Sequence, residues 1–139
     1  MLTPYRVLDL TDSRAELATF VLAGLGADVI KVEPPGGSAS RLESPLADDE
    51  PAALASIRFH AYNRGKRSVV IDLDGPDGRS EFLALVASAD FVFENAGPGA
   101  MDERGLGFDM LRHARPDLVY VALSPFGENG PYAHHMRRT

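Results

Sequence analysis

The segment from Glu94 to Leu111 reads ENAGPGAMDERGLGFDML and combines one asparagine with glycines at positions 97 and 99. The side chain of Asn95 offers both hydrogen-bond donors and an acceptor. Glycine lets the main chain come close to a bound molecule, because it carries no Cβ atom. Asn95, Gly97 and Gly99 therefore predict contacts between amide groups and a ligand. The alternative is an ordinary turn between a strand and a helix.

A second candidate is the segment NRGKRS, which places Lys66 and Arg67 beside a glycine in a chain whose net charge is -6. Lysine and arginine attract phosphate groups, and arginine binds them through two parallel hydrogen bonds. The segment therefore predicts contact with a phosphate-bearing ligand. The alternative is a charged loop that is simply solvated.

Several kinds of chemistry are excluded by residue type. The chain has no cysteine, which rules out disulfides, thiolate metal ligands and cysteine nucleophiles. Its four histidines do not show the spacing of a zinc site, so we expect no metal. The sequence contains neither a G-x-S-x-G elbow nor a G-x-G-x-x-G dinucleotide motif. Residue types alone therefore assign no catalytic residue.

The overall composition narrows the partners. An acidic chain with a pI of about 5.1 lacks the basic face that nucleic-acid binding requires. Its first residues, MLTPYRVLDLTDS, do not have the basic start and apolar run of a signal peptide. No apolar stretch approaches the roughly 20 residues of a membrane span. We expect a cytoplasmic protein without nucleic-acid or membrane partners.

Strands and helices alternate along the chain. The apolar runs predict five strands, at residues 5–11, 27–33, 67–74, 90–95 and 118–127. Helices are expected across residues 12–26, 51–63, 75–89 and 107–114. Ser13 and Glu16 have the spacing of a capping box, and we expect Leu17, Val21 and their helical neighbours to face the core.

This alternation favours an α/β fold, a Rossmann-like three-layer domain with a mostly parallel sheet. We expect a single domain over residues 1–139, with residues 34–57 forming a long surface loop. In open α/β sheets, ligands bind beyond the carboxyl ends of the strands. The segments expected at that edge are residues 12–16, 33–37, 72–75, 95–99 and 124–132.

Four motifs in this order carry a resemblance to a known family: LGADVIKVEPPGG, NRGKRSVVIDLD, ADFVFENAGPGAMDERGLGFDML and RPDLVYVALSPFGENGPYA. The chain resembles, from about Val7 to Ala133, the N-terminal portion of the class III CoA-transferases. This CaiB–BaiF family includes formyl-CoA and carnitine-CoA transferases and the related α-methylacyl-CoA racemases. The resemblance implies a Rossmann-type sheet with CoA lying along the carboxyl ends of its strands.

The resemblance also implies roles for particular residues. Asn95 and the turn from Gly97 to Gly99 would approach the pantetheine arm and the thioester of CoA. Lys66, Arg67 and the backbone at Ile71 would line its nucleotide. The backbone at Glu33 and Pro34 would border the adenine. Coenzyme A or an acyl-CoA is then a substrate, with no permanently bound cofactor.

In the transferases of this family an aspartate attacks the acyl-CoA thioester and forms a mixed anhydride. That aspartate lies beyond the motif GPYA, in sequence that this chain does not contain, so we expect the isolated chain to be inactive. The C-terminal portion of the family fold is also absent, and we expect a homo-oligomer or the missing portion as partner. The first loop, DSRAELAT, departs from the Ala-Gly-Pro turn of common members.

Two alternatives remain open at this point. One is a relative of the α-methylacyl-CoA racemases, whose proton-transfer residues also lie beyond GPYA. The other is a non-catalytic module that uses an uncovered face of the sheet to bind another protein. The sequence does not identify the acyl donor or the acyl acceptor.

Overall fold

The computed structural model describes residues 1–51, 54–133 and 135 of the chain. Its centre is a five-stranded sheet in the order β3-β2-β1-β4-β5, and every neighbouring pair is parallel. The strands are β1 (Arg6–Asp9), β2 (Asp28–Glu33), β3 (Arg67–Val70), β4 (Phe91–Glu94) and β5 (Val119–Ala122). The predicted α/β fold with a mostly parallel sheet is confirmed.

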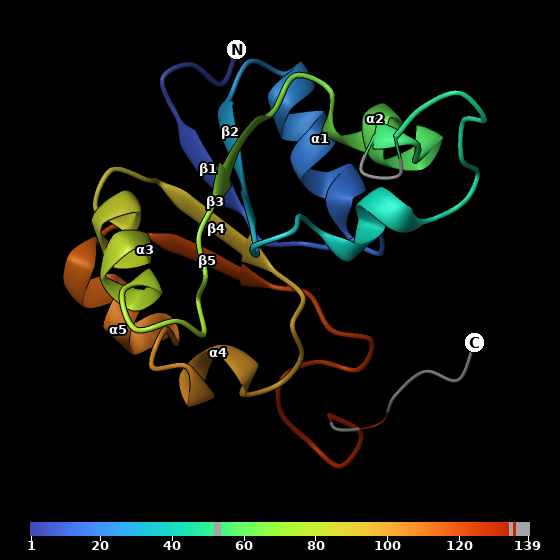
Figure 1. Ribbon diagram of the computed structural model, residues 1–139. Helices are drawn as coiled ribbons and strands as arrows, with labels where there is room; N and C mark the ends of the chain where they lie inside the picture. Colours follow the sequence, from blue (N-terminus) through green and yellow to red (C-terminus); the bar gives the residue numbers. More distant parts are fainter. Residues whose placement is uncertain (52–53, 134, 136–139) are drawn as a thin grey trace.

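Helices cover both faces of this sheet (Figure 1). One face carries α1 (Glu16–Gly24), and α2 (Ile57–Asn63) lies beside α1. The opposite face carries α3 (Gly78–Val86) and α5 (Phe108–Ala114), with the short α4 (Ala100–Glu103) below them. This division follows from right-handed crossovers, because the chain moves outward from β1 to β3 and then returns to add β4 and β5.

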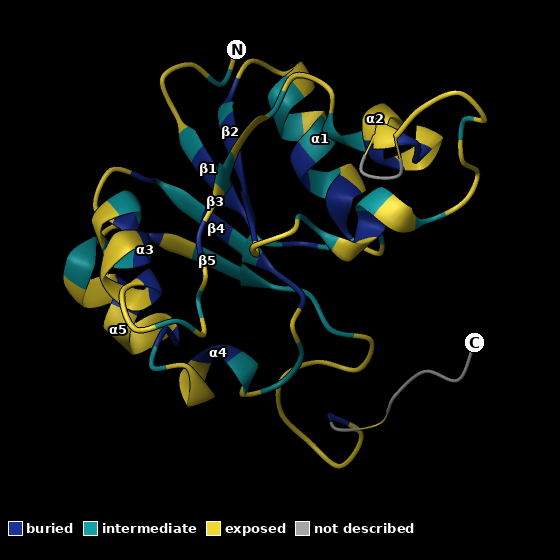
Figure 2. Cartoon of the chain, in the orientation of Figure 1, coloured by how far each residue is buried: buried dark blue, intermediate teal, exposed yellow. Residues whose placement is uncertain are grey.

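The larger part of the core lies between the sheet and the helices α3 and α5 (Figure 2). Phe82 and Val86 of α3 are completely buried there. A smaller apolar cluster, built on Val7, Ala27 and Val29, lies on the face that carries α1. Past this small cluster, toward the carboxyl ends of β1 and β2, the residues that face α1 are charged instead of apolar.

The predicted start of α1 is wrong. Ala15 occupies the cap position without a side-chain hydrogen bond, and Ser13 donates instead to Glu43 at 2.7 Å. Glu16 is buried in an ion pair with Lys31, whose Nζ atom lies 2.9 Å from Glu16 Oε1. The helix is therefore rotated so that Glu16 faces the sheet, which leaves Leu17 56 % exposed.

The loop after β2 has more structure than the sequence indicated. A 3-10 turn, η1 (Ala39–Leu42), interrupts it, and Leu46 forms an antiparallel bridge with Ser56. The helix expected from residue 51 begins at Ile57, because the Ser56 side chain caps it by accepting from the Phe59 amide at 3.1 Å. Residues 52–53, which fall in the predicted helix, lie outside the described residues.

Within the described ranges, the helices are too short or too polar to cross a membrane.

Candidate ligand-binding site

The turn that follows β4 presents its main chain at the carboxyl edge of the sheet, defined here as the edge formed by the carboxyl ends of the parallel strands. Gly97 and Gly99 have φ angles of 103° and 76°, a region that side chains disfavour. A Cβ atom added at either glycine would meet no other atom within 4 Å. The structure therefore places the predicted glycines in an open turn that a ligand can reach.

Asn95, at the start of this turn, is clasped by the loop after β1. Its Oδ1 atom accepts from the Asp12 amide at 3.0 Å, and its Nδ2 atom donates to Asp12 Oδ1 at 2.6 Å. The clasp joins β1 and β4, the neighbouring strands from which the chain moves off in opposite directions. Such a topological switch point is where open α/β sheets bind ligands.

Arg14 completes the clasp. Its guanidinium contacts both carboxylate oxygens of Asp12, with the shortest distance 2.7 Å, and also donates to the Asn95 carbonyl at 3.3 Å. Partial burial pushes the pKa of Asp12 upward, but hydrogen bonds from Arg14 and Asn95 outweigh burial and hold this pKa below its ordinary value. The Asn95 side chain thus fixes the turn, while the space around Gly97 and Gly99 stays open.

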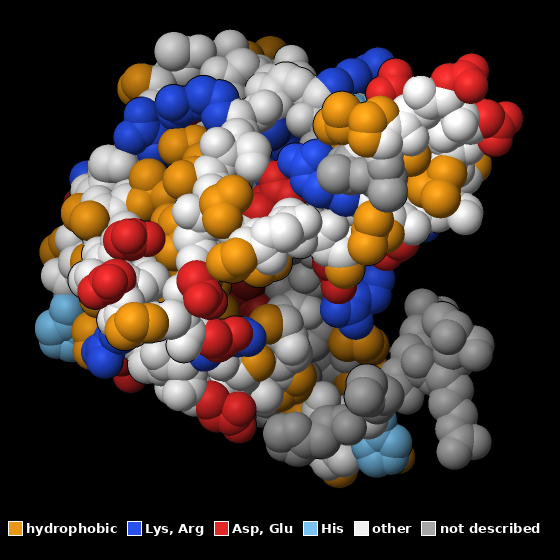
Figure 3. Space-filling model, in the orientation of Figure 1, with side chains coloured by type: hydrophobic (Ala, Val, Ile, Leu, Met, Phe, Trp, Pro, Cys, Tyr) orange, Lys and Arg blue, Asp and Glu red, His pale blue; other side chains and the backbone are white. Residues whose placement is uncertain are grey.

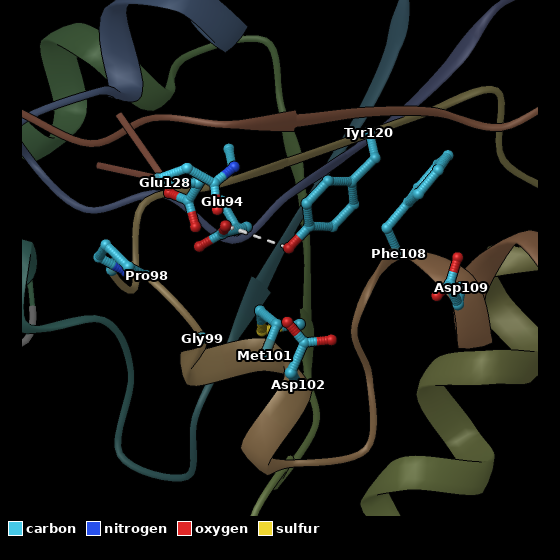
Figure 4. A pocket seen from close by; sticks show the side chains of 12 residues that line it. Glu94, Pro98, Gly99, Met101, Asp102, Phe108, Asp109, Tyr120 and Glu128 are labelled. Carbon is cyan, nitrogen blue, oxygen red and sulfur yellow. Dashed lines mark hydrogen bonds between the residues drawn. The ribbon is translucent and has the colours of Figure 1, made fainter. Parts of the chain in front are cut away.

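A cavity of about 690 Å³ lies beside this turn, at the ends of β4 and β5 (Figure 4). Its volume falls within the range of about 300–1,000 Å³ that is typical of small-molecule sites. Its lining residues come from the turn, α4, the start of α5, β5 and the segment after β5: Glu94, Gly97, Pro98, Gly99, Met101, Asp102, Phe108, Asp109, Tyr120, Ala122, Glu128 and Asn129.

Glu94 is the most buried acidic group of the cavity, with 3 % of the residue exposed. Its carboxylate accepts from the Tyr120 hydroxyl at 3.1 Å, the contact drawn in Figure 4, and from the Ala96 amide at 2.7 Å. Burial raises the pKa of Glu94 above its ordinary value, and the nearby charges of Glu128 and Asp102 act in the same direction. Burial and the neighbouring Glu94 also raise the pKa of Tyr120.

The charged side chains that line the cavity all have the same sign. Glu94, Asp102, Asp109 and Glu128 contribute four carboxylates, and the described lining residues include no lysine or arginine. In Figure 3, acidic side chains gather over the half of the molecule that carries α3, α4 and α5. This part of the carboxyl edge therefore repels anions.

The other face of the sheet contains a buried network of paired charges. Lys66 lies in it: its Nζ atom is 2.8 Å from Asp9 Oδ2 and donates to Thr19 Oγ1 at 2.8 Å. Its side chain is 1 % exposed, so it is not the exposed loop cation that the sequence indicated. Burial lowers the pKa of Lys66, and the attraction of Asp9 opposes that effect. The contact of Lys66 with CoA phosphates stays a prediction.

Arg67, the residue after Lys66, lies outside this buried network. Its guanidinium pairs with Asp28, at 2.6 Å, and its side chain is 61 % exposed. Asp28 begins β2 and Arg67 begins β3, so this pair lies toward the amino ends of the strands. The structure does not bring Lys66 and Arg67 together as one cationic group, and the phosphate contact of Arg67 also stays a prediction.

Glu33, Pro34 and Ile71 meet at the ends of β2 and β3. The Glu33 carboxylate is buried and accepts from Arg41 Nε at 2.6 Å and from the Ser38 amide at 2.9 Å. Although burial alone would raise it, these hydrogen bonds lower the pKa of Glu33 to about 2. Pro34 is exposed, and the Ile71 amide donates to the Glu33 carbonyl at 2.9 Å. Glu33 thus anchors the loop that follows β2.

Among the described residues, no group of three or more His, Asp or Glu side chains is arranged to hold a metal ion. Sequence reasoning missed two features of the site. The first is α4, which forms the floor of the cavity. The second is the buried network around Asp9, Lys31 and Glu16. The sequence does contain a signal for this network: charged residues within the otherwise apolar strands RVLD and DVIKVE. A charge that is buried in a sheet requires a partner.

Comparison with known proteins gives consistent matches over nearly the whole chain. The model of the family described as CoA-transferase family III matches residues 2–137. The probable fatty acyl-CoA transferase Rv3272 of Mycobacterium tuberculosis is 45% identical over 129 residues, which cover 92% of this chain and 32% of that protein. The succinyl-CoA:mesaconate CoA-transferase of Haloarcula hispanica is 43% identical over 124 residues, 88% of this chain and 31% of that protein.

Solved structures agree with these matches. A CAIB/BAIF family protein from Brucella suis superimposes with a TM-score of 0.85 at 38% identity, covering 95% of this chain and 35% of that one. The Rv3272 structure from Mycobacterium tuberculosis gives a TM-score of 0.82 at 41% identity, with 94% and 34% covered. The chain spans about a third of the length of the relatives that it matches.

Proposed function

Since the chain belongs to CoA-transferase family III, we propose that it forms the CoA-binding portion of an enzyme that moves CoA between carboxylic acids. The observation that carries this proposal is the open glycine turn, Gly97 to Gly99, beside a cavity at the carboxyl edge of a parallel sheet. The pantetheine arm and thioester of CoA would lie along this turn. Asn95 would hold the turn in place through its clasp with Asp12.

The nucleotide of CoA would lie over the ends of β2 and β3, against the backbone at Glu33, Pro34 and Ile71. The charges of the cavity support this placement of the nucleotide, because the carboxylates of the cavity repel the phosphates of CoA. Lys66 would support the site from within the protein through its pair with Asp9. Of the two cations that the sequence predicts to contact phosphate, Arg67 has the more exposed side chain.

The transfer reaction itself belongs to the same proposal. A carboxylate attacks the thioester carbonyl, the carbon–sulfur bond breaks, and CoA leaves as a thiolate while a mixed anhydride forms. The attacking aspartate would be supplied by polypeptide outside this chain. We therefore expect the isolated chain to bind CoA weakly and to show no turnover.

Calorimetric titration with CoA tests the binding site. We expect Gly97→Ala to abolish measurable binding, because its Cβ atom would stand where the ligand approaches. Gly26→Ala is the matched control: Gly26 also has a positive φ, 97°, and a Cβ atom there would make only ordinary contacts, but it lies between α1 and β2, at the opposite edge of the sheet. The same backbone strain should then leave CoA binding intact. Loss of binding in both variants, or in neither, contradicts the proposed site.

A specific observation favours a second candidate, a protein-interaction role. An apolar strip, defined by Tyr5, Phe91, Phe93 and Val119, lies on the side of the sheet that carries α1. Tyr5 and Val119 are each nearly half exposed. Exposed apolar strips of this kind favour association with another chain. Light scattering should then show an oligomer that Val119→Lys dissociates, whereas a monomer at all concentrations would contradict this role.

A further inference from the structure

We propose that the cavity beside β4 and β5 receives the acyl group of the thioester and selects acyl groups that carry no second carboxylate. This inference rests on the proposed function, because it requires the thioester to lie along the turn from Gly97 to Gly99. It goes further by naming the class of acyl group. Uncharged, apolar acyl chains are accepted, and dicarboxylic acyl chains are disfavoured.

The position and walls of the cavity support an acyl site. Gly97, Pro98 and Gly99 form one wall, so a thioester on the turn opens directly into the cavity. Met101 and the rings of Phe108 and Tyr120 supply apolar surface, and the two ring centroids lie 5.9 Å apart. Figure 4 shows these side chains around a common space. Apolar walls of this kind favour hydrocarbon over water.

The charges of the cavity are what disfavours an acyl group with a second carboxylate. Its four carboxylates are Glu94, Asp102, Asp109 and Glu128, and no ion pair within the described ranges neutralises any of them. A terminal carboxylate on the acyl chain would enter this field without a cation to receive it. Leaving a carboxylate desolvated and unpaired is costly, so such a chain binds more weakly.

Glu94 and Tyr120 also make the side of the cavity formed by β4 and β5 unsuited to a carboxylate. The Tyr120 hydroxyl is a neutral donor in the wall of the cavity, but it already donates to Glu94 Oε1 at 3.1 Å. The Ala96 amide likewise donates to Glu94, at 2.7 Å. Glu94 thus occupies two donors that an incoming carboxylate would need.

The test compares two six-carbon thioesters, hexanoyl-CoA and adipoyl-CoA, which differ by the terminal carboxylate. Their affinities for the full chain are measured by calorimetry beside that of CoA alone. We expect hexanoyl-CoA to bind at least roughly tenfold more tightly, as one unpaired carboxylate costs about 1.4 kcal/mol or more. In the double variant Asp102→Asn, Glu128→Gln, the ratio should fall to about threefold through tighter adipoyl-CoA binding.

The double variant Asp77→Asn, Glu81→Gln is the matched control, because it removes two negative charges from exposed positions at the start of α3 without touching the cavity, and the ratio should stay as in the native chain. A salt series gives a second readout that needs no variant. The ratio should fall as ionic strength rises, since the screening length shrinks from about 10 Å at 0.1 M to about 3 Å at 1 M.

The outcomes separate the two levels of the proposal. Absence of CoA binding overturns the proposed function and this selection with it. If CoA binds but the two thioesters bind equally, or adipoyl-CoA binds more tightly, the selection alone is overturned. A tenfold ratio that neither the double variant nor salt reduces also contradicts selection by these carboxylates.

Discussion

The two faces of the sheet treat buried carboxylates in opposite ways at the carboxyl edge. On the face that carries α1, Asp9, Glu16 and Glu33 each form an ion pair with a lysine or arginine. On the face that carries α3 and α5, the partners of Glu94 among the described residues are both neutral, the Tyr120 hydroxyl and the Ala96 amide. Both faces bury acidic groups, but only one neutralises them.

This difference gives the two faces of the sheet different interpretations. A buried carboxylate that is paired and hydrogen-bonded holds the segments of its partners together, and removal of a partner is costly because it leaves an uncompensated buried charge. A carboxyl group with a raised pKa beside a cavity is instead typical of a functional site. We therefore interpret the α1 side as the support that fixes the loops, and the cavity beside β4 and β5 as the part that meets substrate.

The largest expected effect breaks the paired side. Lys66→Met removes one of the two cations near Asp9, and we expect the free energy of unfolding to fall by about 3–5 kcal/mol. Urea denaturation measures it. Arg67→Met is the control on the adjacent residue, where loss of an exposed pair with Asp28 should cost at most about 1 kcal/mol. Equal losses in the free energy of unfolding would show that the buried ion pair of Lys66 contributes no more to stability than the exposed pair of Arg67.

Glu33→Gln should have the next largest effect, and that effect should depend on pH. The pKa of Glu33 is lowered to about 2 in the folded chain, from 4.5. Its charge therefore stabilises the fold above pH 4.5, by about 3 kcal/mol, and this contribution is lost as the pH falls toward 2. Denaturation of the native chain and Glu33→Gln should differ most near pH 7 and converge in acid. A constant difference across this range would contradict the assignment.

The clasp between the loops after β1 and β4 should contribute less. We expect Asp12→Ala and Asn95→Ala each to lower stability by about 1–2 kcal/mol, because each leaves a polar partner unsatisfied. In a double-mutant cycle the second substitution should then cost little, which gives a coupling energy of about 1 kcal/mol. Additive effects of the two substitutions would mean that the loops after β1 and β4 are held independently.

The smallest effect is expected on the unpaired side. Glu94→Gln should change stability at pH 7 by less than about 1 kcal/mol, since the amide still has an acceptor oxygen for the Ala96 donor. Because the pKa of Glu94 is raised, its contribution is present in acid and is lost as the pH rises through that pKa. The variant should therefore gain on the native chain as the pH rises above 4.5, the ordinary pKa of a glutamate. If it loses ground instead, Glu94 is paired after all.

The sequence predicted the architecture better than the site. Apolar runs in five segments were enough to predict the parallel sheet, because strands buried on both faces need them. The orientation of α1 failed, since Glu16 and Thr19 replace apolar residues on its buried side. Their partners, Lys31 and Lys66, come from distant segments, and no local pattern reveals such pairing. Gly97 and Gly99 were found because a positive φ leaves its own signal, glycine, in the sequence.

Amide NMR spectra of the ¹⁵N-labelled chain, recorded during titration with CoA, test the central claim most directly. Binding at the carboxyl edge predicts that the amide signals of Asn95, Gly97 and Gly99 shift with one common affinity. The signal of Gly26, on the loop before β2 at the opposite edge of the sheet, should stay in place. Shifts confined to residues away from the carboxyl edge, or none at millimolar CoA, would contradict the account.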